Sequence, residues 1–169
     1  MWPLDQAHGG KEKCDLLDMT LNSEMTSAGL HLTGLASSNA VVNNYPADMI
    51  SKEFSWMARV KVSIDKDGPL FSWKKNNEFA THIWVVDLKL YTRVVFVGNA
   101  CGTFHTISAQ WMVLNRWYTL AVSYNAQTGT HNTWVDDEAS VTVRNYPCGG
   151  DILADGDAYI GGWFVNLNK

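Results

Sequence analysis

Hydrophobic and polar positions alternate along much of this chain, and the clearest case is the segment EFSWMARVKVSID, residues 53–65. Every second position there is apolar: Phe54, Trp56, Ala58, Val60, Val62 and Ile64. The positions between them carry Ser55, Met57, Arg59, Lys61 and Ser63. Because successive side chains of a β-strand point to opposite faces, this period of two predicts a strand with one buried face.

Further segments have the composition of short strands, and polar turns such as DKDGP, KKNNE and NAQTG separate them. We expect strands at 29–34, 39–44, 69–73, 79–86, 89–97, 103–108, 117–124, 131–136, 138–144 and 158–162. No segment shows a sustained helical pattern. Many short strands at hairpin spacing predict an all-β antiparallel sandwich or barrel.

Three adjacent acids, Asp136, Asp137 and Glu138, follow the segment HNTWV at 131–135. They pose the question whether they form a catalytic cluster or a turn between strands. Two predicted strands flank Asp136 and Asp137, and aspartate tolerates the positive φ that a two-residue hairpin turn demands. The sequence therefore favours a turn.

Length and composition limit the class of protein. At 169 residues the chain can bury a large core, and we expect residues 1–169 to form a single domain. A content of 46% hydrophobic and 18% charged residues is typical of a globular protein. Thirteen basic against seventeen acidic residues give a net charge of −4, and the longest Lys/Arg run is the pair Lys74, Lys75. We therefore expect no nucleic-acid partner.

The chain ends and cysteines bear on its compartment. No apolar run reaches the roughly 18 residues that span a bilayer, and the first residues lack the apolar core of a signal peptide. Met1 directly before domain-like sequence is typical of an excerpt of a larger protein. Cys14, Cys101 and Cys148 have no C-x-x-C spacing, which argues against a zinc site and a redox dithiol. Asn99 begins N-A-C, the rare cysteine variant of the glycosylation motif, so secretion stays open.

Four segments, in order, match motifs of one protein class. They are WPLDQAHGGKEKCDLLDMTL near the start, residues 68–94, RWYTLAVSYNAQTGTHNTWVDDEASV at 116–141, and DGDAYIGGW at 155–163. In these motifs the chain resembles laminin G-like and pentraxin-like domains of the concanavalin A-like lectin/glucanase superfamily. The resemblance covers nearly the whole chain and implies a two-sheet antiparallel jelly-roll sandwich. Its expected core contains Phe54, Trp56, Val60, Val62, Phe71, Leu120, Val122, Val135 and Ile160.

Three features depart from this family. Asp137 replaces the usual glycine of V-D-G, and residues 14–18 replace the usual D-x-S-G-N-G loop. The family also continues after Y-I-G-G with a further strand, whereas this chain stops at WFVNLNK. Either the last strand is missing, or another chain supplies it.

Enzymatic activity is not expected. The superfamily's glucanases carry a strand pattern like E-x-D-x-x-E, because glycoside hydrolysis needs two carboxylates about 5 to 10 Å apart. None of the five glutamates, Glu12, Glu24, Glu53, Glu78 and Glu138, begins that pattern. The motifs H-E-x-x-H and G-x-S-x-G are also absent from the sequence.

The resemblance implies a calcium site at one rim of the sandwich. It would lie between the loops 97–103 and 148–159, where Asp151, Asp155 and Asp157, together with Asn99, offer the hard oxygen ligands that calcium takes. The alternative is that these Asp-Gly pairs are only turn residues. Since the family places both loops at this rim, the resemblance also implies a disulfide between Cys101 and Cys148. The alternative partner for Cys148 is a cysteine of a missing last strand.

Aromatic side chains supply the remaining candidates for binding. By resemblance, Trp56, Trp117 and Trp134 match core or core-edge positions, where packing is the expected role. Six others lie at strand ends, on alternate faces or in loops: Trp73, Trp84, Tyr91, Trp111, Tyr146 and Trp163. An exposed aromatic ring offers a surface for sugars and protein partners.

The resemblance implies a function in recognition. We expect a non-catalytic extracellular module that binds a glycan or an extracellular protein through rim loops, with Asn99, Tyr146 and Trp163 as ligand-binding residues and calcium as the candidate cofactor. No insertion into a membrane is expected of this domain. The second hypothesis is a structural or assembly module of a multidomain cell-surface or matrix protein, because an unpaired edge strand would favour self-association.

Overall fold

The computed structural model describes residues 19–35, 37–45, 52–75, 78–97, 102–143, 150–154 and 156–162. Within them, the first sheet has seven strands in the order β1-β4-β13-β6-β7-β8-β9. Its bounds are β1 Thr20–Leu21, β4 Asn39–Tyr45, β13 Gly156–Gly161, β6 Gly68–Lys75, β7 Glu78–Val86, β8 Lys89–Val95 and β9 Thr103–Ile107. The second sheet has four strands in the order β12-β11-β10-β5: Glu138–Val143, Thr130–Val135, Trp117–Asn125 and Glu53–Lys61. All pairings in both sheets are antiparallel.

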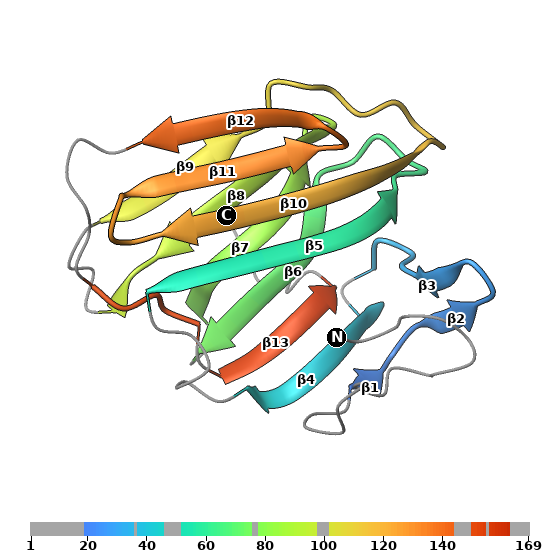
Figure 1. Cartoon of the computed structure of the whole chain (residues 1–169). Helices are drawn as coiled ribbons and strands as arrows, with labels where there is room; N and C mark the ends of the chain where they lie inside the picture. Colours follow the sequence, from blue (N-terminus) through green and yellow to red (C-terminus); the bar gives the residue numbers. More distant parts are fainter. Residues whose placement is uncertain are drawn as a thin grey trace, which may run out of the picture.

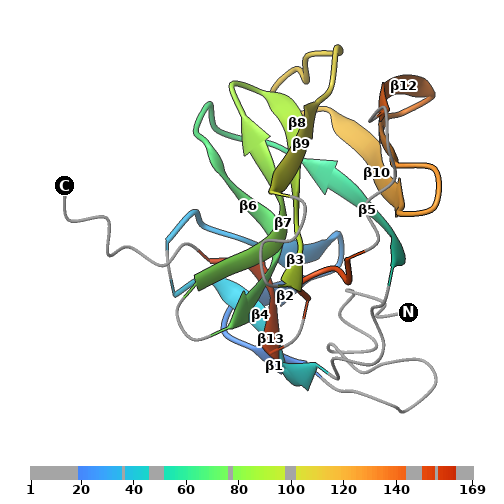
Figure 2. The ribbon, with the colours of Figure 1, turned by 90° about the vertical axis from the view of Figure 1, so that its left-hand side faces the viewer.

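The two sheets lie face to face as a sandwich. Figure 1 shows the four-stranded sheet in front of the seven-stranded one, and the turned view in Figure 2 shows the two layers from their ends. The predicted all-β, two-sheet antiparallel jelly roll is therefore confirmed. Among the described residues, no helix is long and apolar enough to cross a membrane.

The predicted strands recur with shifts of a few residues at their ends. The largest difference is at β5, which ends at Lys61, four residues before the end of the predicted segment 53–65, so that Ile64 lies outside the strand and is exposed. In addition, β3 ends at His31, and β8 ends at Val95, with Phe96 in an isolated bridge to Ile152. Two strands were not predicted: β1, with two residues, and β2 (Glu24–Thr26), with three. Segments this short do not display a period of two.

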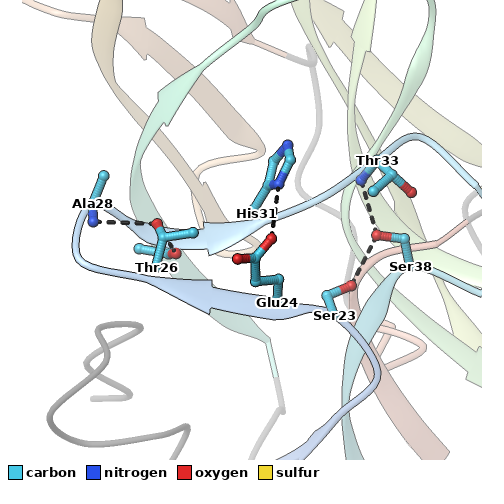
Figure 3. Close-up of polar contacts among 8 residues, drawn as sticks. Ser23, Glu24, Thr26, Ala28, His31, Thr33 and Ser38 are labelled. Atoms are coloured by element: carbon cyan, nitrogen blue, oxygen red, sulfur yellow. Dashed lines mark hydrogen bonds and ion pairs between the residues drawn. The ribbon is translucent and has the colours of Figure 1, made fainter.

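The strands β2 and β3 (Gly29–His31) form a separate ribbon beside the sandwich. Figure 3 shows its polar contacts. At the turn, the Ala28 amide donates to Thr26 Oγ1 over 3.2 Å, and that hydroxyl donates to the Gly29 carbonyl oxygen over 2.9 Å. Along the ribbon, His31 Nδ1 lies 3.7 Å from Glu24 Oε2, with both side chains exposed.

A serine pair joins the ribbon to the chain that leads into β4. The Thr33 amide donates to Ser38 Oγ over 2.9 Å, and Ser38 Oγ lies 2.8 Å from Ser23 Oγ (Figure 3). Ser38 is buried. The Ser38 hydroxyl thus gives the Thr33 amide a hydrogen-bond partner and links the ribbon to the chain before β4.

Inner-facing side chains of both sheets form the core. Leu120, Val122 and Val135 are buried there, as predicted. The other predicted core residues are half-buried: Phe54, Trp56, Val60, Val62, Phe71 and Ile160. Four of them, at 54, 56, 60 and 62, belong to or directly follow β5, which is the last strand of its sheet among the described residues. Their side chains are therefore covered less completely than those of the central strand β10.

The acids at 136–138 form the predicted turn. Val135 pairs with Glu138, so Asp136 and Asp137 are the two residues of a hairpin loop, and Asp136 has φ of 55°. The Thr119 amide donates to Asp136 Oδ1 over 2.9 Å, and Arg116 Nη2 donates to Oδ2 over 3.0 Å. Asp136 thus fastens the turn to the neighbouring strand.

Candidate binding site

The two loops of the predicted calcium rim contact each other at Val97 and Asp151. The Val97 amide donates to the Asp151 carbonyl oxygen over 2.9 Å, and the Leu153 amide donates to the Val95 carbonyl oxygen over 2.7 Å. Asp151 is exposed. The expected meeting of the segments after β8 and before β13 is therefore present at the level of the backbone.

Most residues predicted for this rim lie outside the described residues: Asn99, Cys101, Tyr146, Cys148, Asp155 and Trp163. Asp157 lies within β13 rather than in a loop, and Tyr159 Oη donates to its Oδ2 over 3.3 Å. Burial raises the pKa of Tyr159, and the charge of Asp157 acts in the same direction. Within the described ranges, no group of three or more His, Cys, Asp or Glu side chains is arranged to hold a metal ion. The calcium site and the disulfide stay predictions.

The outer face of the four-stranded sheet carries a shallow depression. Its lining residues come from β5, β10 and β11: Ser55, Trp56, Met57, Ala121, Val122, Ser123 and Trp134. Met57, Ala121 and Trp134 lie opposite one another in register. The central residue, Ala121, has a short side chain. The longer side chains of Met57 and Trp134 therefore project further from the sheet on either side of β10. Met57 is 69% exposed.

Polar groups continue this surface toward the start of β5. A second depression shares Ser55 and Ser123 with the first and adds Glu53 and Asn125. Asn132 Nδ2 donates to Ser123 Oγ over 3.2 Å, and Asn125 Nδ2 donates to Glu53 Oε1 over 2.7 Å. We call the two depressions together the β5–β10–β11 groove.

The other end of the same face is basic and aromatic. Trp117 lies opposite Lys61 in register, and the Lys61 Nζ atom lies 5.4 Å from the centre of its ring. The Arg59 guanidinium carbon lies 5.5 Å from that ring. Trp117 is 37% exposed, and it faces outward because its neighbour Tyr118 is the residue that points into the core. The predicted core-edge packing of Trp117 is therefore wrong.

Comparison with solved structures identifies the fold. The mouse laminin alpha1 chain, domains LG4-5, has a TM-score of 0.63 at 12% identity, with 82% of this chain and 36% of that chain covered. The binding domain of botulinum neurotoxin serotype G has a TM-score of 0.57 at 13% identity, with coverages of 85% and 38%. The serotype D binding domain gives 0.56 at 11% identity, with the same coverages. This protein has the laminin G-like jelly-roll fold.

The chain spans little more than a third of each of these solved chains. No protein-family model and no curated protein matches its sequence. At identities of 11–13%, the likeness concerns the fold alone, and a fold does not imply a binding site.

The remaining aromatic residues of this chain differ in burial. Trp56 packs against the core, as predicted, whereas Trp134 is half-buried on the outer side of β11. Trp73 is buried, and Trp111 is 59% exposed, with the Lys89 Nζ atom 4.4 Å from the centre of its ring. Exposure therefore assigns Trp111, Trp117 and Trp134 to the surface.

A second aromatic surface lies on the outer face of the seven-stranded sheet. Tyr91 stacks between His82 and His105, at 6.2 and 6.0 Å between ring centres. His82 is buried, and this burial lowers its pKa. His105, at the other end of this row, is exposed.

Sequence reasoning did not single out Met57, Ser123, Arg59 or Lys61 as site residues. The period of two in β5 already placed Met57, Arg59 and Lys61 on the face opposite the core. The sequence pattern could not predict the strand register, which places these three residues beside Ala121, Thr119 and Trp117 of β10.

Proposed function

We propose that the domain is a non-catalytic recognition module that binds a glycan on the β5–β10–β11 groove. The observation that carries this proposal is the combination of Trp134 and Met57 on either side of Ala121, with hydroxyl and amide groups beside them. Sugar rings present apolar C–H faces and polar edges, so they suit an aromatic ring next to hydrogen-bonding side chains.

The shape of the groove favours binding over catalysis. It is open and shallow, whereas sites for small substrates are usually concave and enclose most of the ligand. Among the described residues that line the groove, Glu53 is the one carboxylate, and glycoside hydrolysis generally requires two. The names of the two neurotoxin structures, which are binding domains, agree with a role in recognition.

The test is glycan-array binding of the domain and of matched tryptophan variants. Trp134→Ala removes the proposed stacking surface, and we expect at least a tenfold loss, about 1.4 kcal/mol. Trp111→Ala is the control, because it removes an exposed tryptophan that does not line the groove. Melting curves of both variants separate lost binding from lost stability. Equal glycan binding by Trp134→Ala and by the unchanged domain would refute the groove as the glycan-binding site.

The rim loops are the second candidate surface. The backbone bridge between Val97 and Asp151 supports it, since it joins the two loops to which the resemblance assigns binding. Substitution of Asn99, Tyr146 and Trp163 in the same array tests this rim. A loss there, with Trp134→Ala unaffected, would move the ligand site to the rim loops.

Calcium binding at the rim is tested separately, by the melting temperature of the domain. If the ion is held there, Asp155→Ala and Asp157→Ala lower the melting temperature in calcium and leave it unchanged in chelator, because a ligand of the folded state alone stabilises that state. If calcium at about millimolar concentration does not shift the melting curve of the unchanged domain, calcium binding in the range of extracellular modules is refuted.

We further propose an extracellular location, which would suit a glycan-binding module and a Cys101–Cys148 disulfide. An extracellular protein partner and the assembly role are the alternative outcomes. A stable oligomer in light scattering without glycan binding would favour assembly, and a concentration-independent monomer that binds glycans would favour recognition.

A further inference from the structure

We infer that Arg59, Lys61 and Trp117 bind the negatively charged group of an acidic oligosaccharide whose neutral part lies in the β5–β10–β11 groove. This inference rests on the proposed function, since it names the class of glycan that the groove accepts. It concerns one end of the outer face of the four-stranded sheet, the right-hand end in Figure 1, where β5 ends and β10 begins.

The sheet geometry gathers the cations on one side. Arg59 and Lys61 are two positions apart on β5, so their side chains leave the same face of the strand. Both lie about 5.5 Å from the Trp117 ring, and both are exposed. Contact with an aromatic face limits the freedom of long side chains at little cost in hydration. Two positive charges therefore lie beside the same exposed ring.

Neither charge is compensated within the described part of the chain. No carboxylate there lies within ion-pair distance of Arg59 or Lys61. The nearby Asp136 is already engaged, because it accepts hydrogen bonds from Arg116 and from the Thr119 amide. An incoming anion would find uncompensated positive charge at this end of the face, and guanidinium and ammonium groups both bind a carboxylate or a sulfate.

The cationic end adjoins the groove. Arg59 lies opposite Thr119, one step along the sheet from the row of Met57 and Ala121. Successive residues on one face of a strand are roughly 7 Å apart, a distance that a single sugar residue can span. Trp134 lies two strands from β5, about 10 Å across the sheet, so a sugar stacked on Trp134 would reach Arg59 with an acidic group through a further sugar residue that lies over Ala121 and Met57.

The opposite end of the groove limits where a ligand can carry negative charge. Glu53 lies there, eight residues before Lys61 on the same strand. A chain with acidic groups along its whole length would bring a negative charge against Glu53, whereas a ligand with a neutral body and one acidic end would not. The face therefore selects a terminal acidic group over a polyanion.

The experiment is a glycan array in which neutral oligosaccharides are paired with their sialylated and their sulfated derivatives, with heparin fragments as polyanions. We expect the acidic member of a pair to bind about tenfold more tightly than its neutral parent. This preference should fall as salt rises from about 50 to about 200 mM. The sialylated and sulfated arms distinguish carboxylate from sulfate as the recognised group.

The decisive variant is the double substitution Arg59→Met and Lys61→Met, which keeps aliphatic side chains beside Trp117. It should abolish the preference for acidic glycans and leave the binding of neutral parents unchanged. Lys52→Met is the matched control, because it removes an exposed lysine just before β5, on the side of Glu53. Unchanged melting curves establish that all variants are folded.

The outcomes separate this inference from the proposed function. Equal binding of acidic and neutral members, or a preference that survives the double substitution, overturns the inference. If Trp134→Ala still removes binding, the glycan-binding proposal stands. Heparin binding stronger than that of singly charged glycans overturns the predicted preference for a ligand with one acidic end. Binding of no array member overturns both proposals.

Discussion

A buried histidine makes the stability of the domain depend on pH. His131 on β11 has no exposed surface. Its Nε2 atom lies 2.6 Å from Thr92 Oγ1, and its Nδ1 atom lies 3.1 Å from Thr106 Oγ1. The two threonines come from β8 and β9, so the imidazole joins the two sheets. Burial lowers the pKa of His131 to about 4, and the positive charge of His105 acts in the same direction.

The sign and size of the effect follow from these pKa values. The unfolded chain has a histidine pKa of about 6.5, so it takes up the proton more readily than the folded protein. The stabilisation is therefore complete above about pH 6.5 and is lost as the pH falls toward about 4. A difference of about 2.5 between the pKa values corresponds to about 3 kcal/mol in full, of which about 2 kcal/mol is lost at pH ~5. The lowered pKa of His82 adds a loss of the same sign.

Urea unfolding at about pH 7.5 and about pH 5 measures this loss as a change in the free energy of unfolding. In His131→Gln, an uncharged side chain that can still bond to Thr92, the change should be about 2 kcal/mol smaller than in the unchanged domain. His31→Gln is the control, because His31 is exposed. Carboxylates titrate alike in all three proteins and cancel in the comparison. If His131→Gln loses as much stability in acid as the unchanged domain, the buried neutral imidazole is refuted.

Two further predictions concern the backbone. Asp136→Ala should lower the free energy of unfolding by about 2 kcal/mol, because it removes the acceptor of the Thr119 amide and leaves a side chain at positive φ. Asp136→Gly should lose about half as much, and equal losses would show that the turn backbone is not strained. Gly161→Ala should cost about 2 kcal/mol, since its φ is 68° and a Cβ atom would lie 2.6 Å from Leu32 Cδ1. Gly34→Ala, also at positive φ but with 3.7 Å to the nearest atom, should cost less in thermal unfolding, and a larger loss there would contradict the steric argument.

The sequence by itself determined the fold class and the direction of most side chains. In β5 the alternation alone predicted that Trp56 faces the core and Met57 faces away, because the side-chain period of a strand is fixed by its backbone. Hairpin chemistry likewise predicted the turn at Asp136 and Asp137. Such features depend on residues close together in the chain.

Only the tertiary structure decided which outward residues become neighbours. The β5–β10 register brings Lys61 to Trp117 and Met57 to Ala121 across more than fifty residues of sequence, and no local pattern encodes that pairing. The same holds for His131, whose isolated position on a strand does not reveal that Thr92 and Thr106 meet it from the other sheet. Local backbone geometry sets the face on which a side chain lies, whereas strand pairing and sheet packing set what it touches.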